Sequence, residues 1–154
     1  MKSIANQQEA FVNSLPLMNT VRLELPAIHK YLNVIGACIH AMLDREQGLK
    51  EKDSLFYNIE LAVHEACTNI VEHAYAGVTG RIEIIFTLLE EPRRFVIELR
   101  DRGQSFNLAD AAAPDLDQPQ TSGYGLFLVH QLMDEVAYYP EPGNNLWRLV
   151  KYFE

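Results

Sequence analysis

The sequence predicts an α+β sandwich in which one mostly antiparallel sheet lies under three helices. The patterns follow the order strand, helix, helix, strand, strand, loop, helix, strand, strand. Strands this adjacent in sequence lack the crossovers that parallel strands need, which excludes a doubly wound parallel sheet. The length of 154 residues, with 48% hydrophobic residues, fits one domain with a sizeable core. Residues 1–19 are weakly patterned and are expected to form an N-terminal arm, with the domain over residues 20–154.

The first half of the domain reads as a strand followed by two amphipathic helices. Residues 20–25 alternate between apolar and polar side chains, which is the period of a half-buried strand. Apolar residues then recur at helical spacing over residues 28–47, and Gly48 closes that helix. A second helix is predicted over residues 53–76, with Asp53 as its N-cap.

The second half reads as a hairpin, a long loop, a helix and two strands. Residues 81–89 and 93–101 are rich in Ile, Phe and Val, and the break between them is short enough for a hairpin. Residues 105–122 have no sustained period, and a loop of this length inside a compact domain is often a functional lid. The remaining elements are a helix beginning near Gly125 and strands at about residues 136–139 and 146–153, which the turn residues Pro142-Gly143-Asn144-Asn145 join.

Composition and charge limit the classes of partner and compartment. The chain carries 13 Lys and Arg against 21 Asp and Glu, a net charge of −8, which leaves no concentrated positive face for duplex nucleic acid. Cys38 and Cys67 lie in apolar, helix-like stretches, which fits a reduced compartment. No apolar run approaches the roughly 18 residues of a membrane span, and the polar start lacks the apolar centre of a secretion signal. We therefore expect a cytoplasmic protein without direct contact to nucleic acid or membrane.

The second predicted helix carries a polar stripe of Glu65, Asn69 and His73. Their spacing of i, i+4 and i+8 drifts only about 80° around an α-helix, and small apolar residues lie beside the stripe. A carboxylate and a carboxamide one turn apart can hold Mg²⁺ or its waters, and a partly desolvated Glu can accept a proton from a hydroxyl. The alternative is an ordinary solvated helix face.

A second candidate group lies where the hairpin ends and the loop begins, from Asp101 to Phe106. An Asp at the end of a strand can accept a hydrogen bond from an exocyclic amine, and Gly103 lets a flat ring approach the backbone. We expect Phe106 to pack in the core or to anchor the loop. The alternative for Asp101 and Gly103 is a common Asp-x-Gly turn.

A third candidate group, Gly123-Tyr124-Gly125-Leu126, opens the helix after the loop. N–H groups that glycines expose at a helix N-terminus bind phosphate through aligned dipoles. The motif lacks the strand before it that a Rossmann fingerprint needs, and it lacks the Lys of a P-loop. The alternative is a flexible entry into the helix.

Taken in order, Glu-x-x-x-Asn-x-x-x-His-Ala, Asp-x-Gly-x-x-Phe and Gly-x-Gly-Leu resemble the motifs of the GHKL ATPase superfamily. The closer resemblance is to anti-sigma-factor serine kinases of the RsbW/SpoIIAB type, for which residues 59–69 are nearly a signature. Residues 123–129 and 132–136 repeat the likeness, as does the ending over 150–153. The resemblance covers residues 20–154.

The resemblance implies a Mg-ATP-dependent serine/threonine protein kinase with the GHKL fold. Such a kinase phosphorylates an anti-sigma-factor antagonist with a STAS-type domain, sequesters a sigma factor, and is commonly a homodimer. The roles that the resemblance implies for single residues all concern ATP, Mg²⁺ or the substrate hydroxyl. They are Glu65 as the base, Asn69 as the Mg²⁺ ligand, His73 as a structural hydrogen bonder or nucleotide contact, Asp101 as the reader of the adenine amine, Gly103 as the opening for the ring, and Gly123 and Gly125 as the lining of the phosphate site.

The sequence departs from the superfamily pattern near its end, where a Thr often stands on the strand behind the nucleotide. Asn144, Asn145 and Trp147 occupy that region here, so phosphate or adenine contacts from it stay open. The lid is short, which excludes the large lids of gyrase-like and MutL-like members.

Two rival functions remain at this point. One is a nucleotide-binding interaction module of the same fold without kinase turnover. The other is the catalytic domain of a two-component histidine kinase, which needs a dimerising helical hairpin with a phosphoacceptor His. Residues 1–19 are too short for that hairpin, and His29 and His40 lie on what reads as a helix of the domain.

Overall fold

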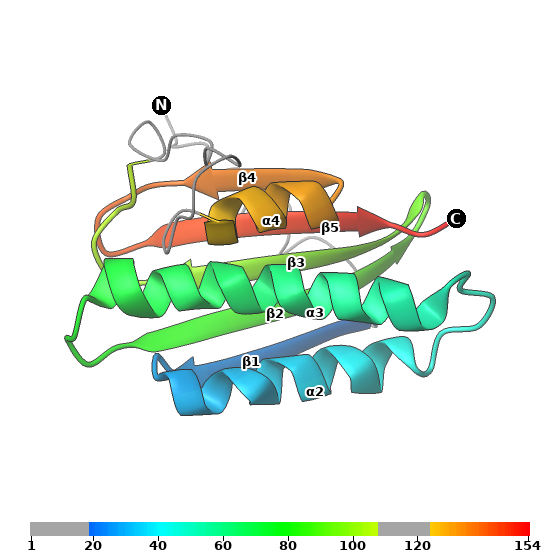
Figure 1. Cartoon of the computed structure of the whole chain (residues 1–154), viewed down its shortest axis with the longest axis horizontal. Helices are drawn as coiled ribbons and strands as arrows, with labels where there is room; N and C mark the ends of the chain where they lie inside the picture. Colours follow the sequence, from blue (N-terminus) through cyan, green and yellow to red (C-terminus); the bar gives the residue numbers. More distant parts are fainter. Residues whose placement is uncertain (1–18, 108–123) are drawn as a thin grey trace.

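An antiparallel sheet forms one layer of the fold, and helices cover one of its faces (Figure 1). The computed structural model of the chain describes residues 19–107 and 124–154, so most of the predicted arm and most of the predicted loop lie outside the described residues. The strands in these ranges are β1 (Thr20–Pro26), β2 (Arg81–Glu90), β3 (Arg93–Asp101), β4 (Glu135–Tyr139) and β5 (Asn145–Tyr152). Their order is β1-β2-β3-β5-β4, and every neighbouring pair is antiparallel. The predicted fold class is confirmed.

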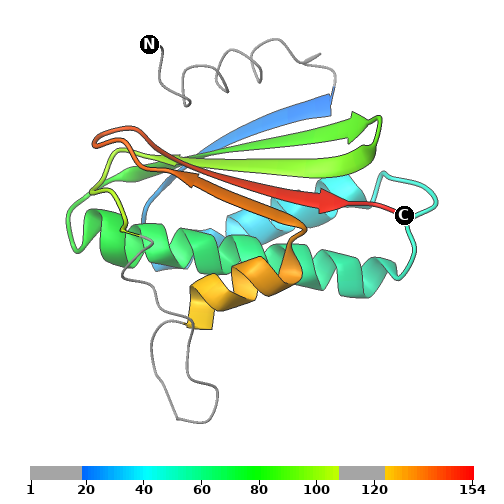
Figure 2. The same cartoon turned by 90° about the horizontal axis from the view of Figure 1, so that it is seen from above.

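Three α-helices of the described ranges form the second layer, which Figure 2 shows on one side of the sheet. They are α2 (Leu32–Leu43), α3 (Lys52–Asn69) and α4 (Tyr124–Leu132). The long helix α3 lies in the middle, with α2 along one side and α4 along the other (Figure 1). None of the described helices is long and apolar enough to cross a membrane.

The core lies between the two layers, and α3 contributes a face of mostly small side chains to it. Its buried residues recur at helical spacing, and alanines among them let the helix axis approach the sheet closely. The sheet contributes apolar side chains from alternate positions on β2, β3 and β5 to this core. The central buried residues are Ile59, Ala62, Val63, Ala66, Ile82, Ile84, Phe86, Ile97, Leu99, Val129 and Leu149.

The first predicted helix is shorter than its apolar pattern indicated. A single 3-10 turn, η2 (His29–Tyr31), precedes the α-helix, and the α-helix ends at Leu43 instead of Gln47. Leu43 is the last fully buried position, and the three residues after it are polar, so continuing the helix would bury no further apolar surface. Gly48 still turns the chain, with φ of +73°.

Two details of the second predicted helix were wrong. Asp53 is not the N-cap; that position belongs to Glu51, and Asp53 lies in the first turn, where a carboxylate complements the helix dipole. The α-helix also stops at Asn69 and continues as a π-helix, η3 (Ile70–Tyr75). Contacts with the chain after β3 hold this wider turn: Gln104 N–H donates to the Ala74 carbonyl (2.8 Å), and Arg102 N–H donates to the Tyr75 hydroxyl (2.9 Å).

Candidate functional site

The elements that carry the predicted site residues meet at one end of the sandwich, where β5 also begins (Figure 1). Helix α3 and its π-helical extension end there, and so does β3, whose last residue is Asp101. Helix α4 and strand β5 both begin at this end. The antiparallel topology therefore brings together motifs whose described residues lie up to sixty positions apart in the chain, from Glu65 to Gly125.

Asp101 is buried at the end of β3 in this region. Only 3% of the residue is exposed, and burial raises the pKa of its carboxyl, although two hydrogen bonds act in the opposite direction. Both bonds reach Oδ1: Gly103 N–H donates to it at 2.9 Å, and the Asn145 amide donates to it at 3.0 Å. Within the described part of the chain no donor contacts Oδ2, which leaves this oxygen free to accept a hydrogen bond from a ligand.

Gly103 allows the loop after β3 to press against η3. A Cβ on Gly103 would lie only 2.4 Å from the Ala74 carbonyl oxygen, a contact that backbone would have to move to relieve. The adjacent hydrogen bond from Gln104 to the same carbonyl depends on this close approach. The structure thus gives Gly103 a packing reason of its own, and the predicted approach of a flat ring stays a prediction.

Glu65 and Asn69 lie one turn apart near the end of α3, and both are half-buried. A Cβ on Gly125 would lie 2.6 Å from Glu65 Oε2, so the Glu65 carboxylate lies directly against the first turn of α4. The structure therefore brings together two residues that the sequence placed in separate motifs. Gly123, the other glycine of the third motif, lies outside the described residues.

His73 does not extend the stripe as an α-helix would have placed it. The stripe assumed about 100° per residue, but residues 70–75 form a π-helix, which changes the angle between Asn69 and His73. His73 is exposed, and the centroid of its ring lies 6.0 Å from that of Phe106. Its side chain therefore contacts the root of the loop after β3.

Aromatic side chains hold the loop where it leaves β3. Phe106 N–H donates to the Tyr138 hydroxyl at 2.7 Å, and the ring centroid of Phe106 lies 6.5 Å from that of Trp147. Tyr138 and Trp147 stack on each other with centroids 4.4 Å apart. Phe106 thus fastens the start of the loop to β4 and β5, in agreement with the expectation that it anchors the loop.

Sequence reasoning left the role of Asn145 open, and the structure places it beside Asp101. The pattern assigned Asn145 to the turn before the last strand, but it is the first residue of β5 and is paired directly with Asp101 across the sheet. Its side chain is fully buried. The one signal in the sequence was a polar residue at the start of an apolar strand, which has meaning only once the strand register is known.

The donor set at this end of the fold fits a magnesium ion that is shared with phosphates. The described residues contain no cluster of three or more His, Cys, Asp or Glu that could hold a metal by themselves. Mg²⁺ in phosphate sites takes only one or two protein oxygens and completes its shell with phosphates and water. The half-buried Asn69 carboxamide has no hydrogen bond to another described residue, so its oxygen is free for that role.

Comparison with known proteins decides the family. The family described as histidine kinase-like ATPase domain matches residues 25–151. Serine-protein kinase RsbW of Bacillus mycoides is 32% identical over 142 residues, which are 87% of this chain and 85% of the relative. This chain belongs to the RsbW-type serine-protein kinases. RsbW of Bacillus anthracis matches with the same identity and coverage.

Solved structures agree with the fold of an RsbW-type kinase. The crystal structure of the RsbU and RsbW domains of a Mycobacterium tuberculosis protein has a TM-score of 0.63 at 22% identity, covering 88% of this chain and 33% of that chain. A histidine kinase domain from an Erythrobacter litoralis blue-light-activated kinase has a TM-score of 0.52 at 16% identity, covering 94% and 68%. At these identities the likeness concerns the fold alone. The RsbW relationship itself makes the chain an ATP-dependent serine/threonine protein kinase.

Proposed function

We propose that this RsbW-type kinase transfers the γ-phosphoryl group of Mg-ATP to a Ser or Thr hydroxyl of an anti-sigma-factor antagonist with a STAS-type domain, and that it sequesters a sigma factor. The observation that carries the proposal is the Glu65 carboxylate lying against the first turn of α4 at Gly125. A candidate base is thereby next to a helix start, which is where phosphate binds most readily in proteins. Asp101 gives the same end of the fold a buried acceptor for an adenine amine.

In this proposal the nucleotide is bound at two points. The adenine amine donates a hydrogen bond to Asp101 Oδ2, and the phosphates lie at the N-terminus of α4, where aligned backbone N–H groups favour negative charge. Asn69 is one turn away from Glu65 and is the residue that would hold Mg²⁺. When bound, Mg²⁺ supplies neutralisation of the charge on the phosphates.

The transfer step then needs one proton acceptor. The substrate hydroxyl oxygen forms a bond to the γ-phosphorus, while the bond from that phosphorus to the oxygen of ADP breaks. Glu65 takes the proton that leaves the hydroxyl, and ADP keeps the electron pair of the broken bond. Because phosphoryl transfer depends mostly on positioning and charge neutralisation, these few groups suffice.

The experiment that tests the function measures binding and transfer separately. Calorimetry with Mg-ATP is expected to give a dissociation constant in the micromolar range or tighter, which corresponds to a binding free energy of roughly −8 kcal/mol. Labelled ATP, the kinase and an antagonist domain encoded near its gene are expected to yield label on the antagonist. Binding without label on any such antagonist would favour the rival function, a nucleotide-binding interaction module. Absence of heat with millimolar Mg-ATP, on folded protein, would exclude the nucleotide site.

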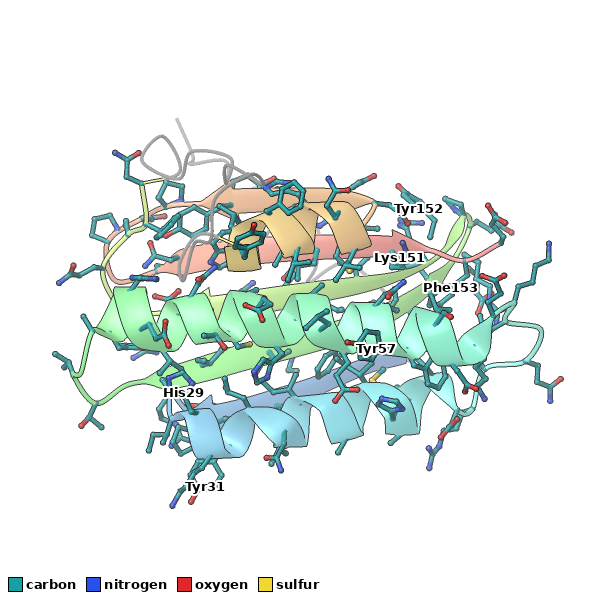
Figure 3. The ribbon with its side chains drawn as sticks, in the orientation of Figure 1. His29, Tyr31, Tyr57, Lys151, Tyr152 and Phe153 are labelled. Atoms are coloured by element: carbon teal, nitrogen blue, oxygen red, sulfur yellow. The ribbon has the colours of Figure 1, made fainter. Side chains whose placement is uncertain are left out.

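The proposal includes a homodimer to which β1, η2 and α2 contribute. Val21 on β1 and Val34 on α2 are 39% and 40% exposed, and Tyr31 in η2 points away from α3 (Figure 3). A second copy of the chain that covers these side chains would remove their apolar surface from contact with water. Light scattering is expected to report twice 17.6 kDa, and a mass of 17.6 kDa at high concentration, with and without nucleotide, would contradict it.

A further inference from the structure

Asn145 is a buried residue of the sheet and not a solvated turn residue. It is the first residue of β5, lies directly opposite the last residue of β3, and is completely inaccessible to solvent. Its neighbour Asn144 is exposed, and the hydrogen bond it makes is through its backbone N–H to the Glu141 carbonyl. Two adjacent asparagines, one just before β5 and one at its start, thus have opposite environments.

The Asn145 amide is saturated with hydrogen bonds in one orientation only. Its Nδ2 contacts three acceptors and its Oδ1 contacts two donors, all within 3.2 Å; they are Asp101 Oδ1 (3.0 Å), the carbonyls of Gly103 (3.0 Å) and Gln104 (3.2 Å), the Ser105 hydroxyl (2.8 Å) and Glu141 N–H (3.1 Å). Turning the amide over would place its NH₂ against the Glu141 N–H donor and its oxygen against a carboxylate and two carbonyls. The amide orientation is therefore fixed by its surroundings.

This fixed amide determines how the Asp101 carboxylate is presented. Asn145 and Gly103 both donate to Oδ1, so the carboxylate cannot rotate without losing two hydrogen bonds. The oxygen without a described donor is then always Oδ2. The Asn145 bond also stabilises the ionised form of a carboxyl whose pKa burial raises. An ionised carboxylate only accepts hydrogen bonds, whereas a protonated carboxyl can donate one instead.

We infer that Asn145 is a positioning residue that sets the preference of this site for a purine with an exocyclic amine, by holding Asp101 Oδ2 as an acceptor. The inference rests on the proposed nucleotide binding and adds to it the source of base selectivity. Asn145 itself does not contact the base in this scheme, because both hydrogens of its amide are already engaged within the protein.

The test compares ATP with purine riboside triphosphate, which lacks only the amine. Wild-type protein is expected to bind ATP at least about tenfold more tightly, the usual effect of one hydrogen bond to a charged acceptor. In Asn145→Ala the ratio is expected to fall to about threefold or less. The matched control Asn144→Ala, at the preceding position, is expected to keep the wild-type ratio. Calorimetry gives both constants, and circular dichroism verifies that each variant is folded.

The ratio separates positioning from mere structural support. If Asn145 had a purely structural role, its loss would weaken the binding of both nucleotides equally. An unchanged affinity ratio in folded Asn145→Ala therefore overturns the inference. If that variant does not fold, Asn145→Asp replaces it, because an Asp keeps the size and the acceptor toward Ser105 and Glu141. Two buried carboxylates share a proton at low pH and repel each other when both ionise. In Asn145→Asp the ratio of the affinities for ATP and purine riboside triphosphate is therefore expected to fall as the pH rises from 6 to about 8.5. A ratio that stays constant overturns the inference.

The wild-type measurement distinguishes this inference from the proposed function. Wild-type protein that binds neither nucleotide contradicts the nucleotide site, and the inference is lost with it. If wild-type protein binds ATP and purine riboside triphosphate equally, the nucleotide site stands, but recognition of the amine by Asp101, as positioned by Asn145, is overturned. Loss of the ratio in Asn145→Ala alone, with the Asn144→Ala control intact, supports both.

Discussion

Asp101→Asn is expected to weaken ATP binding by about 100-fold, or roughly 3 kcal/mol. The two described donors to Oδ1, from Gly103 and Asn145, determine which way the new amide faces. The amide oxygen has to take the place of Oδ1 to keep those bonds, so the NH₂ takes the place of Oδ2. It then meets the adenine amine donor to donor. The substitution converts an attraction into a repulsion without changing the size of the side chain.

The matched control for this substitution is Asp44→Asn. Asp44 follows α2 at the opposite end of the sandwich, where its carboxylate pairs with Lys52 at 3.1 Å on the surface. The same chemical change there is expected to leave ATP binding unaltered. Calorimetry measures both variants, and equal ATP affinity in Asp101→Asn and wild type would remove Asp101 from adenine recognition.

The same carboxyl predicts a pH dependence of binding. Burial raises the pKa of Asp101, and only the ionised form accepts the amine hydrogen bond. The contribution of Asp101 to ATP affinity is therefore present above this raised pKa and is lost as the pH falls through it. The loss is expected at a higher pH than for an Asp with the usual pKa. In Asp101→Asn this component of the pH profile is expected to disappear.

The second large effect is expected at Glu65. Glu65→Gln is expected to lower phosphoryl transfer by roughly 100-fold or more, the usual contribution of a general base, while ATP binding survives. Gln keeps the size of Glu and some capacity as an acceptor against the first turn of α4, but it cannot take the proton. The readout is label transferred from ATP to the antagonist, measured beside calorimetry with ATP.

Two further variants define what loss of the base means. Asn69→Ala is expected to weaken both ATP affinity and transfer, because a magnesium ligand serves binding as well as chemistry. Glu72→Gln is the control: Glu72 is exposed on the π-helical extension and pairs with His29 at 3.5 Å. It is expected to transfer at the wild-type rate. Equal transfer by wild type and Glu65→Gln would contradict the role of Glu65.

Periodicity and turn chemistry predicted the sheet and the helices well because those signals are local. The hairpin of β2 and β3 follows from two β-rich segments around a short break, and its register pairs Glu90 with Arg93 as expected for so short a turn. The same local reasoning placed Asp101 at a strand end and Gly125 in the first turn of a helix. The sequence around these residues did not indicate which distant segments they contact in the folded chain.

Two of the features that the sequence did not reveal depend on contacts between distant segments. The π-helix over residues 70–75 goes with bonds from Arg102 and Gln104, which no periodicity within α3 can indicate. Asn145 reads as one more turn residue until the pairing of β3 with β5 sets it opposite Asp101. In both cases helix or turn propensity was overridden by tertiary hydrogen bonds.

The position of β5 has a consequence for synthesis of the chain on the ribosome. β5 is the last strand to be made, yet it lies inside the sheet between β3 and β4, both of which precede it. A nascent chain that has already exposed α3 and Asp101 still lacks the strand that brings Asn145 to that carboxylate. The proposed acceptor for adenine is thus oriented only after β5 has left the ribosome and paired with β3, so the proposed nucleotide site is completed after every other described strand and helix has been made.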